Sequence, residues 1–187
     1  MVVWFLLVLA SLLPSVASAE HPHEHGVATL DVAVDGRKLT LQFESPLDNV
    51  IGFEHAPRTD KQRATLKKME EKLQAGERLF KPAAAAACTL RGVTIDHPYR
   101  APAAAGKGSP AGGKGPDAKD KATKDEEEHA EVSATYEMDC AKPEALDRVE
   151  VLIFETFPGV KSLKAQTASP RGQRGATLSA RARTLAF

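Results

Sequence analysis

Alternation of apolar and polar residues predicts that the first folded segment is a β-hairpin. Leu30, Val32 and Val34 alternate with mostly polar neighbours, and a second alternating run covers residues 39–43. Such alternation places the apolar side chains of each strand on one face. Asp35-Gly36 lies between the runs, and this dipeptide is typical of a two-residue type I′ turn because glycine accepts a positive φ. We therefore expect an antiparallel pair joined at Asp35-Gly36.

The next segment, from about residue 59 to residue 75, has the pattern of one principal helix. Thr59 and Gln62 have the spacing of a capping box. Gly76 is placed to cap the end of this helix. Most other positions carry Lys, Arg or Glu, so the helix should pack one side on a sheet. The apolar residues that recur at helical spacing are Leu66, Met69 and Leu73.

Later runs predict further strands and an α+β fold, mainly antiparallel β-sheet with one principal helix. The run at 149–154 is more apolar than the others, as a central strand would be. Gly92 interrupts the strand expected over residues 90–96. The remaining strands are expected at 132–140, at 163–167 and, as one or two more, within 176–187.

A low-complexity insert separates two halves of what we expect to be a single domain over residues 26–187. Residues 101–124 are mostly Ala, Gly, Pro and Lys, and an acidic run follows at 125–128. Such a stretch cannot bury enough apolar surface to offset its ordering entropy, so disorder is predicted over 101–128. The two flanking strands could then pair, with the insert as an overgrown hairpin loop.

The N-terminal segment, residues 1–19, indicates export to the periplasm. Residues 1–16 are almost wholly apolar and lead into Ala17-Ser18-Ala19, the small-x-small pattern of a signal-peptide cleavage site. The apolar run is shorter than the about 20 residues of a membrane span. Since no Cys lies near the cleavage site, we expect neither a lipid nor a transmembrane anchor.

The two cysteines, Cys88 and Cys140, bracket the insert. In an oxidising compartment an even pair is typical of a disulfide bond, and the alternative is two buried free thiols. A bridge would close a loop of about 50 residues and stabilise the fold by about 4 kcal/mol on the chain-entropy estimate.

Charge balance and missing motifs exclude several classes of function. The chain has 25 basic and 25 acidic residues, so nothing suggests nucleic acid or an anionic membrane as a partner. We find no nucleophile elbow, no His-Glu-x-x-His helix and no phosphate-cradling glycine loop. We therefore do not expect an enzyme.

Three of the six histidines lie within five residues, in a mature N-terminus expected over residues 20–25. In an extended chain His21, His23 and His25 project to the same side, and Glu24 could add an oxygen ligand. Imidazole suits Zn, Cu, Ni and Fe, so the cluster indicates a transition metal. The alternative is a solvated terminus that binds metal adventitiously. Cleavage after Ser18 would make His21 the third residue, a position that favours square-planar Cu(II) or Ni(II).

Other candidate ligands lie elsewhere in the chain. His129 follows three glutamates, and this run is either a weak metal site or a solvated charge run. Glu54 and His55 precede the helix and could complete a site with His25, although such a histidine more often hydrogen-bonds its own turn. His97, next to Pro98, is expected on the surface.

Several stretches together resemble the family of zinc-regulated periplasmic zinc-uptake proteins typified by ZrgA. The most specific is Gly52-Phe53-Glu54-His55-Ala56-Pro57-Arg58. The others are His23-Glu24-His25-Gly26, Ser45-Pro46, the Cys pair around a polar insert, Phe157-Pro158-Gly159 and Ser169-Pro170-Arg171-Gly172-Gln173.

The resemblance covers essentially the whole mature chain. It implies a soluble periplasmic protein that captures zinc and supports its import, alongside a dedicated metal transporter. Members usually carry a long His/Asp-rich tract in the insert, which is reduced here to residues 126–129. This departure gives more weight to the N-terminal histidines and to His55 as zinc ligands.

Overall fold

The computed structural model describes residues 24–100 and 130–187. The predicted signal segment, His21, His23, His129 and the predicted insert therefore lie outside the described residues. The principal helix is α2 (Asp60–Gln74), and the other helical segments are α1 (Leu47–Ile51), α3 (Gly76–Leu79), η1 (Ala84–Ala86), η2 (Pro143–Ala145) and α4 (Ile153–Thr156). The strands are β1 (Val27–Asp35), β2 (Lys38–Pro46), β3 (Phe80–Pro82), β4 (Cys88–Asp96), β5 (Glu131–Cys140), β6 (Arg148–Val151), β7 (Ser162–Ser169), β8 (Gly172–Leu178) and β9 (Thr184–Ala186).

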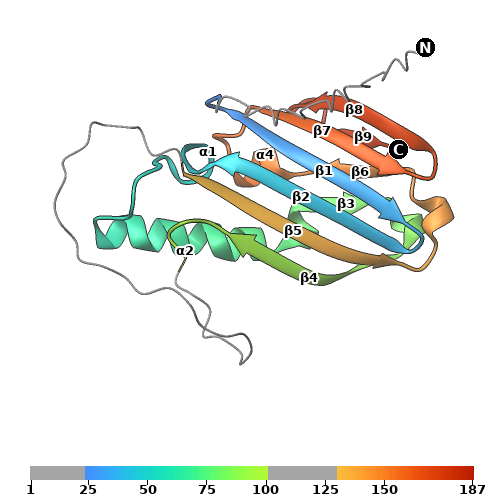
Figure 1. Ribbon diagram of the computed structural model, residues 1–187, viewed down its shortest axis with the longest axis horizontal. Helices are drawn as coiled ribbons and strands as arrows, with labels where there is room; N and C mark the ends of the chain where they lie inside the picture. Colours follow the sequence, from blue (N-terminus) through green and yellow to red (C-terminus); the bar gives the residue numbers. More distant parts are fainter. Residues whose placement is uncertain (1–23, 101–129) are drawn as a thin grey trace, which may run out of the picture.

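Six strands form the main sheet in the order β4-β5-β2-β1-β7-β8 (Figure 1). All neighbours are antiparallel except β1 and β7, which are parallel. A smaller sheet, β3-β6-β9, lies behind the main one (Figure 1). The predicted α+β class, mainly antiparallel with one principal helix, is confirmed.

The β1–β2 hairpin is confirmed, but its predicted turn is wrong. Asp35 pairs with Lys38, so the two loop residues are Gly36 and Arg37. Gly36 has φ 54°, whereas Arg37 is not among the residues with positive φ. Positive φ at the first loop residue alone is characteristic of a type II′ turn, not of type I′. The alternation predicted both strands, but the turn between them lies one residue later than expected.

Helix α2 begins as predicted and ends differently. The Thr59–Gln62 capping box is present, and Leu66, Met69 and Leu73 are buried. The C-cap is Ala75 rather than Gly76, which opens α3 instead. A Cβ at residue 76 would lie 2.5 Å from Cδ1 of the buried Tyr136, so glycine is required there by close packing.

Strands β4 and β5 pair across the insert, as the sequence predicted. Cys88 lies opposite Cys140, and the two form a disulfide bond. Gly92 follows a register shift between residues 90 and 92, which accounts for its interruption of the alternating pattern.

The run at 149–154 is only partly a strand. β6 ends at Val151, and Ile153 begins the short helix α4. The strand is central, as predicted, but in the smaller sheet. Val149 and Val151 of β6 are buried in the same core as Ile153 and Phe154 of α4, which explains why one apolar run covers two kinds of element.

One apolar core joins the two sheets and α2. The inward faces of the main strands supply residues such as Leu41, Phe43 and Tyr136, all fully buried. The opposite face of the main sheet is polar and exposed or half-buried, as the alternating burial of β2 and β5 shows. No helix within the described ranges is long and apolar enough to cross a membrane.

Candidate metal-binding site

The topology brings the candidate ligands of the described chain to one end of the main sheet. β2 ends at Pro46 opposite Glu131, where β5 begins, and Asp96 of β4 lies opposite Ser133. β1 begins at Val27 beside Ser162 of β7, so the turn that carries His25 lies at this same end. Helix α1 and the loop that carries Glu54 and His55 follow directly from β2 (Figure 1). We call this region the α1 end of the sheet.

A buried asparagine fixes the point from which the N-terminal segment leaves the fold. The side-chain oxygen of Asn49 accepts from the backbone N–H of Gly26 at 2.6 Å. Its amide nitrogen donates to the Val27 carbonyl at 2.9 Å and to Ser45 Oγ at 3.2 Å. Asn49 is 5% exposed. Two of the three hydrogen bonds of this side chain thus hold residues 26–27 against α1, and the third joins α1 to Ser45 at the end of β2.

The turn at Gly26 is closed from the other side by β7. The Gly26 carbonyl accepts from the backbone N–H groups of Lys161 and Ser162, at 2.8 and 3.0 Å. Gly26 has φ 82°, a conformation that favours glycine. The Asn49 backbone approaches Gly159 so closely that a Cβ there would lie 2.1 Å from the Asn49 carbonyl oxygen. His25 therefore starts from a rigid, well-packed turn.

His25 is oriented by a carboxylate. Its Nδ1 lies 3.2 Å from Oδ2 of Asp48, and its side chain is 74% exposed. An ionised carboxylate only accepts hydrogen bonds, so in the neutral ring Nδ1 carries the proton and Nε2 has the lone pair. A carboxylate on one ring nitrogen is the usual way in which proteins orient a metal-binding histidine. Asp48 is a site residue that sequence reasoning missed, since nothing in the sequence shows that α1 meets residue 25.

His55 offers Nε2 as a potential metal ligand, as His25 does. Its Nδ1 lies 2.9 Å from the carbonyl oxygen of Ala56, so this nitrogen donates and Nε2 is left as a potential ligand. The ring stacks on Phe53 with 5.2 Å between centroids. The backbone carbonyl of Glu54 accepts from the Tyr99 hydroxyl, which ties the loop to the chain after β4. The hydrogen bond within its own turn agrees with the alternative reading of His55.

The described residues do not complete a metal shell. Among residues 24–100 and 130–187, no group of three or more His, Cys, Asp or Glu side chains is placed to hold an ion. Glu24 points to Lys164, with 3.8 Å between Oε2 and Nζ. Of the predicted ligands, Glu24, His25, Glu54 and His55 thus share one end of the sheet without forming a joint site. Their role as zinc ligands stays a prediction.

The expectation that His97 lies on the surface is wrong. Its side chain is fully buried, and Nε2 lies 2.8 Å from Oε1 of Glu70 on α2. Among the residues that the structure describes, none is a hydrogen-bond partner of its Nδ1. The packing of α2 on the end of β4 covers this ring. The Pro98 neighbour suggested a strand end, which is correct, but burial at that end depends on the tertiary fold.

Within the described part of the chain, the two groups whose pKa is clearly shifted, Asp139 and Tyr136, lie away from the candidate ligands. The hydrogen bond from Arg91, together with the hydrogen bond and charge of Arg37, holds the pKa of Asp139 below its ordinary value. Burial raises the pKa of Tyr136 above its ordinary value. Asp139 pairs with Lys38 beside the β1–β2 turn, at the opposite end of the sheet.

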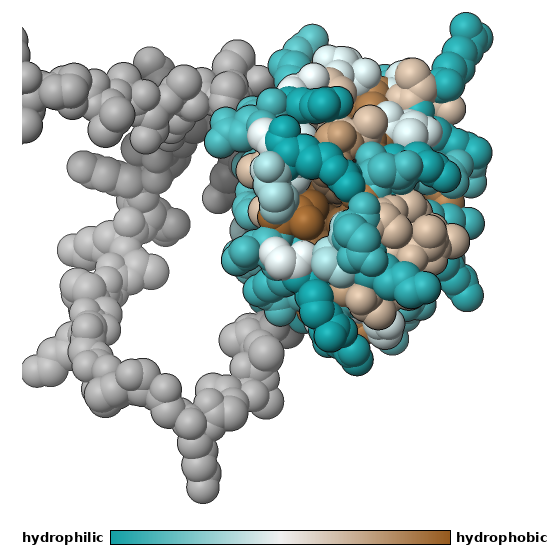
Figure 2. Space-filling model, turned by 90° about the vertical axis from the view of Figure 1, so that its right-hand side faces the viewer, coloured by the Kyte–Doolittle hydropathy of each residue, from teal (hydrophilic) through white to brown (hydrophobic). Residues whose placement is uncertain are grey.

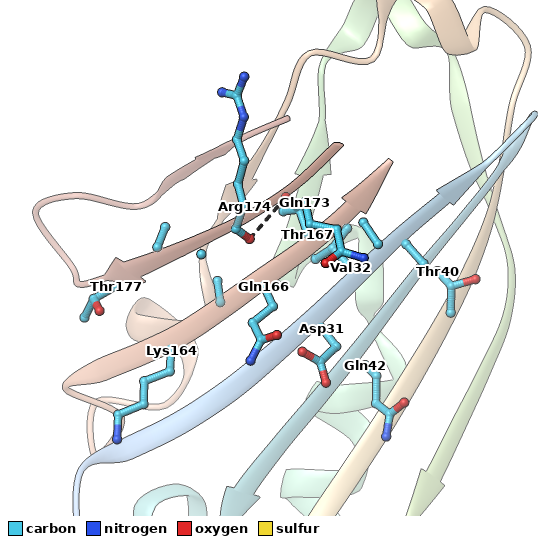
Figure 3. Close-up of a pocket in the computed structure, with 15 residues that line it drawn as sticks. Asp31, Val32, Thr40, Gln42, Lys164, Gln166, Thr167, Gln173, Arg174 and Thr177 are labelled. Carbon is cyan, nitrogen blue, oxygen red and sulfur yellow. Dashed lines mark hydrogen bonds between the residues drawn. The ribbon is translucent and has the colours of Figure 1, made fainter. Parts of the chain in front are cut away.

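Two hollows in the surface carry no histidine. The larger, of ≈ 900 Å³, spreads over the polar face of β1, β2, β7 and β8. Asp31, Gln42, Lys164 and Gln166 project into it from neighbouring strands (Figure 3). The smaller, of ≈ 260 Å³, lies at the end opposite α1 and is lined by apolar groups that include Phe187. Figure 2 shows hydrophobic residues in a hollow ringed by hydrophilic ones at that end.

The fold and its α1 end define an α+β sheet protein that offers exposed imidazole groups suited to a transition metal. The chain belongs to the family described as ZrgA family zinc uptake protein, whose model matches residues 22–187. The resemblance found in the sequence is thereby confirmed, and the protein is related to zinc uptake. No curated protein matches the chain.

Proposed function

We propose that this protein is a non-catalytic, periplasmic zinc-binding protein that captures zinc at the α1 end of the sheet and supports its uptake. Zinc is the cargo in this account. Membership of a zinc-uptake family supports the choice of metal, and the predicted signal segment supports the compartment. Delivery to a periplasmic or inner-membrane metal transporter is part of the proposal.

The observation that carries the proposal is the anchored, carboxylate-oriented ring of His25. Asn49 fixes the adjoining turn, and Asp48 leaves the exposed Nε2 of His25 free to bind. The histidines at positions 21 and 23 adjoin this point in sequence. Because zinc sites usually have three or four protein ligands, the oriented imidazole of His25 and the two histidines just before it would supply most of a shell.

The remaining ligands would come from neighbours at the same end. His55, an exposed residue in the loop after α1, offers Nε2 as a potential ligand when the ring is neutral. The chain re-enters the described structure at Ala130, whose carbonyl accepts from the backbone N–H of Leu47 at 2.8 Å. His129 directly precedes that anchored residue. We propose that the shell is completed by one of four nearby residues, Glu24, Glu54, His55 or His129.

A zinc titration against a competing chelator tests the proposal. We expect a site whose affinity falls by at least about tenfold when residues 21, 23 and 25 are all changed to alanine. Binding should also weaken as the pH drops through about 6.5, because imidazole binds metal only when neutral. Equal affinity of the triple variant and the wild type would remove the N-terminal site from the account.

A matched pair of carboxylate variants tests the orientation of His25. Asp48→Ala should weaken zinc binding by about tenfold, the low end of the effect of losing a carboxylate that orients a ligand. Asp60→Ala removes another exposed carboxylate, which contacts Arg63, and should leave the affinity unchanged. Titrations with Cu(II) and Ni(II) identify the preferred ion, and tighter square-planar binding of either would assign the terminus to that metal instead.

A further inference from the structure

Strand β8 is an edge strand of the main sheet, and no other strand of residues 24–100 and 130–187 pairs with its outer side. It pairs with β7 alone in the sheet order. Residues 172–177 are all exposed, so neither face of this strand is covered along most of its length. In Figure 1 β8 forms the upper border of the sheet.

The backbone groups that face this open side can be identified from the register. The Ser162 N–H donates to the Gly26 carbonyl, so even-numbered residues of β7 bond to β1 and odd-numbered ones to β8. Ala165 pairs with Ala176, and Thr167 pairs with Arg174. The backbone N–H and C=O groups of the even-numbered residues of β8 are therefore the ones that bond to β7. The N–H and C=O groups of Gln173, Gly175 and Thr177 are left pointing to the open edge.

The other sheet edges in the described chain carry features that discourage pairing. β4 is interrupted by a register shift near Gly92 and contacts α2. β3 has three residues and ends in Pro82, and β9 also has three residues. By contrast, β8 has seven residues, no proline and no register shift. Its edge is thus suited to accept another strand.

Exposed basic residues lie on this edge and just after it in the chain, although the whole chain is neutral. Residues 156–187 contain no Asp or Glu. Arg174 and Arg181 are exposed, and Arg174 extends away from the sheet on the side opposite Gln166 (Figure 3). The basic residues of this segment are Lys161, Lys164, Arg171, Arg174, Arg181 and Arg183. Of these, Lys164 pairs with Glu24, and Arg183 pairs with Glu150 and Glu155.

We infer that the β8 edge binds an acidic, extended segment of a partner protein, which adds to the main sheet as a further strand. The backbone of Gln173, Gly175 and Thr177 would supply the hydrogen bonds, and alternate side chains of the added strand would face Arg174. A second copy of this chain fits less well, because edge-to-edge pairing would bring two such basic segments together. This surface is separate from the α1 end that we propose for zinc.

A peptide titration followed by amide NMR tests the inference. The probe is a capped peptide that alternates valine with glutamate, compared with one that alternates valine with lysine. At low ionic strength, where charges are weakly screened, the acidic peptide should bind at least about tenfold tighter. It should shift the amide signals of Gln173, Gly175 and Thr177. Equal binding of both peptides, or no binding of the acidic one, would overturn the inference.

Two sets of variants separate backbone pairing from charge. Gly175→Pro removes an N–H that β7 does not use, which an edge strand tolerates, and should abolish binding. Arg174→Glu with Arg181→Glu should weaken the acidic peptide by about tenfold and favour the lysine peptide. The control, Arg58→Glu with Lys67→Glu, makes the same change in net charge at exposed positions elsewhere and should have little effect.

Two other outcomes would overturn the inference. If the charge-reversal pair and its control weaken binding equally, the attraction is non-specific and the β8 assignment is wrong. If the protein alone forms dimers that Gly175→Pro disperses, the edge belongs to a second copy and the acidic partner is excluded. Zinc affinity should be unchanged in every β8 variant, so this test and the zinc titration fail independently.

Discussion

Replacement of Asn49 by alanine should destabilise the fold and release the N-terminal segment together. The amide makes three hydrogen bonds, to Gly26, Val27 and Ser45. Alanine would leave the Gly26 N–H and the Val27 carbonyl without their partner in a half-buried turn. A polar group left unsatisfied costs about 1–3 kcal/mol. Two such groups, with some access to water, give an expected loss of about 2–4 kcal/mol.

Urea unfolding of wild type and variant measures this loss as a shift in midpoint at constant slope. Hydrogen exchange at residues 26–28 should accelerate, since the turn would open locally. Asp48→Ala is the control: its side chain is 39% exposed and pairs with the exposed His25 ring, so it should cost less than about 1 kcal/mol. An equal loss in both variants, or none in Asn49→Ala, would refute the view that Asn49 anchors the segment.

Three further predictions concern the rest of the fold. Loss of the Cys88–Cys140 bond, by a double serine variant, should lower the free energy of unfolding by about 4 kcal/mol, because a loop spanning 52 residues is no longer closed. Guanidinium unfolding measures this loss, and an unchanged midpoint would contradict the prediction. Gly76→Ala should cost about 1–3 kcal/mol through its clash with the Tyr136 ring, seen as a lower melting temperature. Because the pKa of Asp139 is lowered in the folded state, its contribution to stability is present above the unfolded pKa of about 3.9 and is lost as the pH falls through the folded value. Asp139→Asn should therefore flatten the acid side of the stability profile, and an equally steep profile would argue against the pairing with arginine.

Local sequence patterns predicted much of the fold. The period-two runs predicted both strands of the first hairpin, and the Thr59–Gln62 spacing predicted the start of α2. The two cysteines correctly bracketed a pair of strands. These features depend on neighbours in the sequence, so the sequence alone was sufficient to predict them.

Features that depend on tertiary contacts could not be read in this way. The run at 149–154 divides into β6 and α4 because both pack into one core, where periodicity is lost. His97 looks like a surface residue in the sequence and is covered by α2 in the structure. Gly76 looks like a helix cap, yet its role is to make room for Tyr136.

The candidate site likewise combines features that the sequence predicts with features that depend on tertiary contacts. The histidine cluster was evident from spacing, but the contribution of Asp48 and Asn49 was not. Both lie more than twenty positions from the turn that they hold, and only the fold of β2 and α1 brings them there. The polar face of the main sheet likewise has no sequence motif, because its side chains come from four separate strands.

Crystals of the zinc-loaded protein, measured at the zinc absorption edge, test the central claim most directly. The account predicts an anomalous peak at the α1 end, within bonding distance of His25 Nε2, with Asp48 still hydrogen-bonded to Nδ1. Zinc–nitrogen distances there should be about 2.0–2.1 Å. A peak elsewhere, with His25 and its neighbours unbound, would contradict the claim that this end of the sheet captures zinc.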